Sequence, residues 1–169
     1  MTGATTLQEV YAEVVAQAGI ATAQYGYVRK QGTLRRIVGD NAALINFQKS
    51  RWNSSDSVSF TLNLSIVCGA LLDSGITTIK SAKEYDGHLR QRIGYLTSEA
   101  ADKWWEVNKA TKVVALSAEI ASLVISAAVP YLERYVRTED LAALWETGQS
   151  PGLTEVQRLR YLAQLKKPQ

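Results

Sequence analysis

Apolar and polar residues alternate most regularly between residues 57 and 68. The even positions are apolar, namely Val58, Phe60, Leu62, Leu64, Ile66 and Cys68. The odd positions from 57 to 65 carry hydroxyl or amide side chains. Because successive side chains of a strand point to opposite faces, this run predicts a β-strand with one face in the core and one face toward water or a partner.

Three shorter β-prone runs precede this strand, at residues 25–30, 33–38 and 42–52. The residues between the runs are rich in Gly, Asn, Asp and Ser, which favour tight turns. The pattern therefore predicts an antiparallel meander over about residues 25–68. A further strand is expected near residues 104–107, with one of the two adjacent tryptophans, Trp104 and Trp105, on each face.

Helical spacing flanks the predicted sheet. Thr6 and Glu9 have the spacing of a capping box, so a first helix is expected over residues 7–18, ending near Gly19. Apolar residues three and four apart predict later helices at about 111–136, 139–147 and 153–166, and Pro130 should kink or divide the first of these. Residues 69–103 give no readable pattern.

We therefore expect a single α+β domain over residues 1–169. Its antiparallel sheet should have about four to six strands, with the N-terminal helix and the C-terminal helices packed on one face. The length of 169 residues, with 46% hydrophobic and 21% charged residues, suits one globular domain.

The charge and the cysteine content indicate which partners and which cellular compartment suit the chain. The net charge of +3 is mild and its basic residues are spread along the chain, which suits an acidic partner but is not typical of a nucleic-acid binder. Cys68 is the only cysteine, which excludes an internal disulfide and fits a reducing compartment. Residues 1–9 lack a basic stretch followed by an apolar one, so we expect no secretory signal and a cytoplasmic location.

No catalytic constellation is visible. His88 is the only histidine, so His and Cys cannot supply a metal-ligand set. Its Gly-His-Leu-Arg context predicts a surface loop, whereas Cys68 should be a buried strand residue. The chain has no nucleophile elbow and no phosphate-binding glycine loop. We therefore expect no metal, no cofactor and no enzyme activity.

The apolar stretch of residues 113–132 is long enough to test as a membrane span. It contains Glu119 and Pro130, and its apolar residues are striped as in an amphipathic helix. A carboxylate inside the bilayer costs about 2.5–3.5 kcal/mol. We therefore expect a helix buried against the sheet, and no membrane partner.

The polar side of the sheet is the candidate site. If even positions of the 57–68 strand face the core, the amides of the preceding strand fall on the opposite face beside Thr61 and Asn63. Asn is depleted in strands, so these amides either bond a neighbouring part of the fold or contact a partner. With the adjoining turn residues, the candidate partner-binding face comprises Asn46, Gln48, Ser50, Arg51, Trp52, Thr61 and Asn63.

Several short segments of this region also carry a family resemblance. They are residues 26–30, 34–36, 46–52, 60–64, 92–94 and 104–105. With these segments the chain resembles the family called domain of unknown function 4304, although Leu34 stands where members often have an aromatic residue and Ser65 where they often have Gly. The resemblance implies a small bacterial cytosolic protein, of a kind often found as an immunity or accessory factor near toxin genes. It implies no catalytic role.

Three functions remain open from the sequence. The first is a non-catalytic protein-binding module, such as an immunity or accessory protein that binds an acidic surface of a toxin. The second is an enzyme that uses the polar sheet face to bind a small molecule. The third is a single-stranded nucleic-acid binder that uses Trp52 and Arg51, although the basic residues are better explained as a solvated sheet edge.

Overall fold

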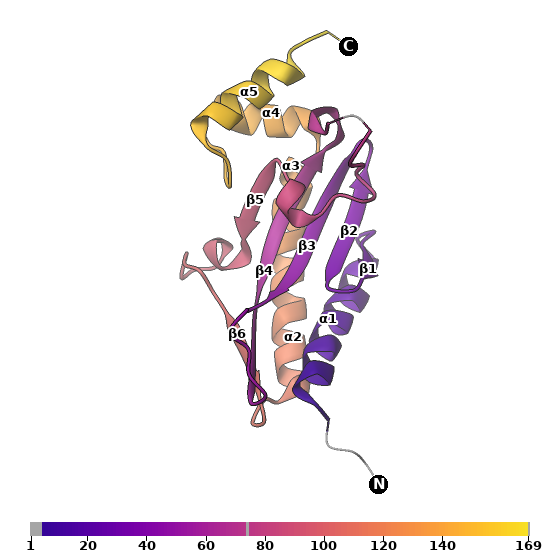
Figure 1. The fold of residues 1–169 in the computed structure, drawn as a ribbon, viewed down its shortest axis with the longest axis vertical. Helices are drawn as coiled ribbons and strands as arrows, with labels where there is room; N and C mark the ends of the chain where they lie inside the picture. Colours follow the sequence, from indigo (N-terminus) through magenta and orange to yellow (C-terminus); the bar gives the residue numbers. More distant parts are fainter. Residues whose placement is uncertain (1–4, 74, 169) are drawn as a thin grey trace.

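The structure is a computed structural model that describes residues 5–73 and 75–168. Over these residues it forms a six-stranded antiparallel sheet with helices against one face and at one end (Figure 1). The α+β architecture with an open antiparallel sheet is therefore confirmed. The strands are β1 (Val28–Lys30), β2 (Thr33–Val38), β3 (Asn41–Lys49), β4 (Ser57–Cys68), β5 (Leu89–Arg92) and β6 (Trp105–Asn108).

β1 to β4 form the predicted meander, and β5, which was not predicted, extends it in the order β1-β2-β3-β4-β5. The last two strands share one edge of β4. β5 pairs with residues 63–66 and β6 pairs with residues 57–60. The connection between them, residues 93–104, therefore has to leave the sheet at the middle of β4 and return to it.

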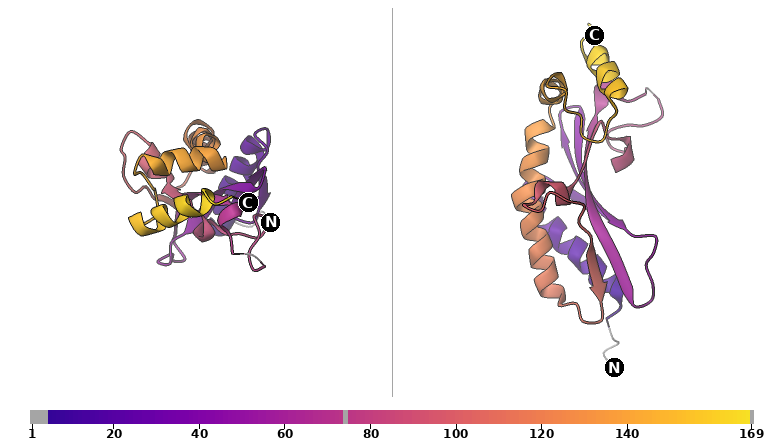
Figure 2. Two further views of the ribbon diagram at one scale, coloured as in Figure 1. Left: turned by 90° about the horizontal axis from the view of Figure 1, so that it is seen from above. Right: turned by 90° about the vertical axis from the view of Figure 1, so that its left-hand side faces the viewer.

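The core lies between the sheet and the helices α1 (Leu7–Ala23) and α2 (Val113–Leu123), which cover one face (Figure 2, right). Phe60 is fully buried at its centre. Its ring centroid lies 5.5 Å from that of Tyr11, 6.1 Å from that of Phe47 and 5.8 Å from that of Trp105. The predicted core positions of β4 are thus confirmed, and so is the burial of one tryptophan of the adjacent pair.

The first helix is longer than predicted. The capping box of Thr6 and Glu9 begins it as expected, but the helix continues past Gly19 to Ala23. Gly19 serves close packing instead of termination, because a Cβ there would lie 3.1 Å and 3.3 Å from side-chain carbons of Arg29. The chain turns at Gly26, whose φ of +84° favours glycine.

The predicted helix at 111–136 is one rod with a local change of winding. After α2, residues Val124–Ala128 form a π-helical turn, and α3 (Val129–Tyr135) continues from it. Pro130 lies in the first turn of α3, where its missing amide hydrogen is best tolerated. The predicted division at Pro130 therefore takes the form of a π-helical turn just before it, and the rod stays continuous.

The rod Val113–Tyr135 is long and apolar enough to cross a membrane, with a mean hydropathy of 1.9 over its most apolar window. Only 28% of that window is buried. Core helices of soluble proteins pass the same test, so this finding is weak evidence for a span.

The remaining helices lie at one end of the sheet (Figure 1). They are α4 (Thr138–Glu146) and α5 (Glu155–Leu165), each within two residues of its predicted bounds. The unreadable stretch 69–103 contains β5 and three short 3₁₀ turns, Gly69–Leu71, Glu84–Asp86 and Ile93–Leu96. Such short turns carry no periodic signal.

Candidate functional site

The sheet face that points away from α1 and α2, here called the far face, is polar and only partly covered. Its residues are fixed by the pairing of β3 with β4, which places Asn46 opposite Asn63 and Gln48 opposite Thr61. Directly paired residues lie on the same face of a sheet. The predicted gathering of these four side chains on one face is therefore confirmed.

One part of the far face is closed by residues 75–88. The guanidinium of Arg35 holds this segment by donating to the carbonyls of Ile79 and Ala82. Ser65, also buried, donates its hydroxyl to the Glu84 carbonyl at 2.9 Å. A small second core forms beneath the segment, from Ala42, Leu44, Val67 and Ala82. This part of the far face therefore serves the fold.

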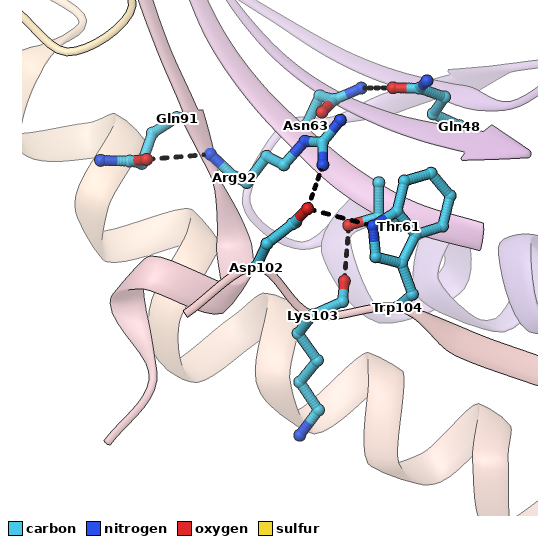
Figure 3. A network of polar contacts seen from close by, with 8 residues as sticks. All are labelled: Gln48, Thr61, Asn63, Gln91, Arg92, Asp102, Lys103 and Trp104. Carbon is cyan, nitrogen blue, oxygen red and sulfur yellow. Dashed lines mark hydrogen bonds and ion pairs between the residues drawn. The ribbon is translucent and has the colours of Figure 1, made fainter. Parts of the chain in front are cut away.

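Two of the predicted partner-binding residues are also occupied within the fold. Thr61 is fully buried and donates its hydroxyl to the Lys103 carbonyl at 2.7 Å (Figure 3). Asn46 is half-buried and donates its amide to the Thr33 hydroxyl at 3.0 Å. These side chains hold neighbouring segments in place, so we do not carry them into the proposed binding surface.

Asn63 and Gln48 form an amide pair in the open part of the face. Asn63 Nδ2 donates to Gln48 Oε1 at 2.7 Å (Figure 3). Gln48 is exposed, and its Nε2 has no partner within residues 5–73 and 75–168. The pair is thus ordered by one internal bond while keeping donor and acceptor capacity for a ligand.

Beside this pair, Arg92 is held in position by two neighbours. Its guanidinium forms an ion pair with Asp102 and lies 5.3 Å from the ring centroid of Trp104 (Figure 3). Trp104 Nε1 also donates to Asp102 at 3.1 Å. Burial raises the pKa of Asp102, but the hydrogen bonds from Arg92 and Trp104 outweigh burial and leave it below the ordinary value. The charged pair is therefore present at neutral pH.

These side chains surround a hollow of about 330 Å³, here called the arginine hollow. It lies between β3, β4 and β5, and Gly152 from the loop before α5 closes one side. Arg90 and Tyr95, both exposed, line it with the amide pair. The full lining is Gln48, Asn63, Leu64, Glu84, Arg90, Gln91, Arg92, Tyr95 and Gly152. Arg92 is paired with Asp102, so Arg90 is the guanidinium in the lining that is left to contact an anionic group.

The turn between β3 and β4 presents a second feature. Trp52 is 94% exposed. Its backbone amide donates to the Ser50 hydroxyl at 3.1 Å, and Asn53 Oδ1 accepts from the Ser59 amide at 2.8 Å. Arg51 is exposed beside it. In the right-hand view of Figure 2 the turn between β3 and β4 extends away from the helices, toward the side of the far face.

Sequence reasoning missed the residues that β5 and its following loop supply. Arg90, Arg92, Tyr95 and Asp102 come from the stretch 69–103, which has no readable periodicity, and Trp104 was expected in a strand but not as part of a site. The one sequence signal that could have found this site is that Arg90 and Arg92 stand two positions apart. That spacing puts both side chains on the same face of a strand.

His88 is buried, so its predicted placement on a surface loop is wrong. Its Nδ1 accepts a hydrogen bond from the Cys68 amide at 3.0 Å, and its ring packs edge-on against Tyr161 of α5. Burial lowers the pKa of His88 to about 4, against opposing effects of the Leu71 carbonyl and Asp86. Cys68 is buried as predicted, and burial raises its pKa. Both residues therefore belong to the packing between the sheet and α5.

Among the described residues, no three His, Cys, Asp or Glu side chains gather as a metal site would require. The chemistry that the far face offers is therefore hydrogen bonding, anion contact and aromatic packing by Trp52 and Trp104.

The comparisons with known proteins identify a family without naming an activity. The model of the family described as "Domain of unknown function (DUF4304)" matches residues 21–134. The match includes every strand and nearly all of the long helix, but neither α4 nor α5. No curated protein and no solved structure matches the chain.

Proposed function

The chain belongs to the family described as domain of unknown function DUF4304, and on that premise we propose that it is a non-catalytic module that binds an acidic protein through its far face. The binding surface in this proposal consists of the Trp52 turn and the arginine hollow. It comprises Gln48, Ser50, Arg51, Trp52, Asn63, Arg90, Arg92 and Tyr95.

The observation that carries the proposal is the exposure of Trp52 on an ordered turn. A tryptophan that contacts almost nothing in its own chain contributes little to folding. Tryptophan and arginine are the residues most enriched among side chains that dominate binding at protein interfaces. Trp52 has Arg51 as its neighbour, and the hollow adds two further arginines.

The charge of the surface supports an acidic partner. Arg90 has no side-chain partner among the residues described, and Arg92 is oriented by Asp102 and Trp104. A pre-oriented guanidinium loses less conformational entropy when it binds a carboxylate. Glu84 and Asp102 offset the charges of Arg90 and Arg92, and Arg51 beside Trp52 gives the whole surface a net positive charge.

The specific form we propose is a bacterial cytosolic immunity protein that blocks a toxin by covering its site. Such a role requires no catalytic group. It requires a rigid surface complementary in charge to the partner, and electrostatic complementarity speeds association between such pairs.

A second candidate is binding of single-stranded nucleic acid. It is favoured by the stacking of Arg92 on the partly exposed Trp104 on a sheet face, since bases stack on such platforms. Counterion release would then give a steep salt dependence that follows the number of phosphates contacted.

The experiment is photo-crosslinking inside cells from benzoylphenylalanine placed at position 52. The matched control carries the same group at position 156, where Val156 of α5 is 77% exposed. We expect position 52 to give one discrete adduct, identified by mass spectrometry as a protein with an acidic surface, and the substitution Arg92→Gln to weaken it.

The purified partner would then be titrated against the wild-type chain and Trp52→Ala. Loss of this indole should raise Kd by about 30-fold or more, as for other interface tryptophans. An RNA or DNA adduct would favour the second candidate instead. Adducts of equal yield from positions 52 and 156, or unchanged Kd for Trp52→Ala, would remove the far face as the binding surface.

A further inference from the structure

The outer side of the long helix, opposite the sheet, carries almost no charge. Glu119 is the only charged residue between positions 113 and 132, and it accepts a hydrogen bond from the Trp105 indole at 2.9 Å. Five exposed positions at four-residue steps form an uncharged ridge, namely Val114, Ala118, Ser122, Ser126 and Pro130. A helix in contact with water usually carries charged or strongly polar residues on that side.

Next to this ridge lies a groove of about 620 Å³ between α1 and α2. Its walls are mainly apolar or small, and Ile20 and Val114 stand 68% and 81% exposed at its sides. The polar wall residues Glu13 and Gln17 bond to each other, with Gln17 Nε2 donating to Glu13 Oε1 at 2.7 Å. The groove is therefore an exposed apolar depression without a free basic group in its wall.

The charge of the surroundings argues for one occupant. An anionic membrane surface attracts faces bordered by several Lys and Arg, whereas the ionisable side chain in the wall of this groove is the carboxylate of Glu13. A second copy of the chain offers an uncharged ridge instead, so no like charges meet at the centre. Because ridge and groove lie side by side on the same face, a twofold axis places each ridge in the other copy's groove.

We propose that the α1–α2 groove and the adjoining ridge form the interface of a homodimer of this chain. The small side chains at Ala118 and Ser122 allow the two helices to approach closely. The interface lies on the opposite side of the sheet from the far face (Figure 2, right). Each dimer therefore leaves two far faces open, and the proposal stands independently of what the far face binds.

The first test is sedimentation velocity of the full chain over concentrations up to about 100 µM. We expect a species of twice the 18.6 kDa chain mass. Val114→Glu should raise the dimer Kd by about a hundredfold, because the twofold axis buries two unpaired carboxylates. Val156→Glu, at a similarly exposed valine of α5, should leave Kd unchanged. Circular dichroism melting of both variants checks that each is folded.

The second test uses disulfide formation. Cys68 is fully buried, so Ser122→Cys supplies one accessible thiol. Under mild oxidation we expect Ser122→Cys to form covalent dimers at a concentration where Val156→Cys does not. Agreement of this test with sedimentation locates the interface on the ridge.

Three results would overturn the proposal. They are a monomer at every concentration, a dimer that survives Val114→Glu, and equal disulfide yield from both cysteine variants. Flotation of the wild-type chain with phosphatidylcholine–phosphatidylglycerol vesicles, lost in Val114→Glu, would also overturn it, because a bilayer would then occupy the face.

Discussion

The two faces of the sheet use alternate residues of the same strands, yet they differ in what covers them. On the core face, Phe60 is fully buried and packs against three aromatic rings. On the far face, Asn63 bonds to a single exposed amide at the edge of an open hollow. The apolar side is closed by two helices, whereas the polar side is closed in part, by residues 75–88 and by the segment that contains Lys103. The comparison separates residues that hold the fold together from residues left free to bind.

The largest expected effect of one substitution is on the core face. Phe60→Ala should lower the free energy of unfolding by about 3–5 kcal/mol, because it removes the ring that three others contact. The comparison is Asn63→Ala, at an open position of the far face on the same strand, which should cost less than about 1 kcal/mol. Urea unfolding followed by circular dichroism measures both. Equal losses would contradict the division between the faces.

At the end of the sheet, acid should weaken the packing of α5. The folded His88 has a pKa of about 4, and the unfolded value is near 6.5. The unfolded chain therefore binds the proton first as pH falls, so stability is fully present above about pH 6.5 and is lost progressively down to about pH 4. The loss should be roughly 3 kcal/mol.

Urea midpoints measured between about pH 4 and 7 check this effect. His88→Gln removes the titrating group and should flatten the pH dependence of the free energy of unfolding over that window. A slope that is unchanged in His88→Gln would assign the acid sensitivity to other groups.

An intermediate loss of stability is expected where Arg35 holds the segment that covers part of the far face. Arg35→Ala leaves the carbonyls of Ile79 and Ala82 without their donor, which should cost about 1–2 kcal/mol. Hydrogen exchange of residues 78–88 should accelerate, while exchange in β3 stays slow. If exchange in β3 and in residues 78–88 rose together, the cover would be part of the main core.

The smallest loss of stability is expected at the arginine hollow. Asp102→Asn removes the ion pair with Arg92, and because this pair is partly exposed the cost in stability should be about 0.5 kcal/mol. Asp56→Asn, at the exposed pair with Lys109, is the matched control. Urea unfolding of both variants provides the measurement. A loss several times larger for Asp102→Asn would show that the hollow supports the fold.

The same comparison explains what could be predicted from the sequence. Alternation in residues 57–68 identifies the core side of β4, because burial of every second residue is a local pattern. The pattern also predicts that Asn46 and Asn63 share a face, whereas their direct pairing is seen only in the structure. Family resemblance pointed to the same strands, and the family match confirms it.

The covering of the far face could not be predicted, because it depends on contacts between distant residues. Arg35 bonds residues more than forty positions away, and Thr61 bonds Lys103. Nothing in the local pattern distinguishes Thr61, which is buried, from Gln48, which is exposed. His88 was misplaced for a related reason, since its cover comes from α5, which follows it by more than sixty residues.

The central claim is that the exposed part of the far face is free for binding and contributes little to folding. The most direct measurement is the free energy of unfolding of a triple variant, Gln48→Ala, Trp52→Ala and Arg90→Ala. All three side chains are exposed, so we predict a value within about 1 kcal/mol of wild type. A loss of about 3 kcal/mol or more, comparable with Phe60→Ala, would contradict the claim, because the surface would then be holding the fold together.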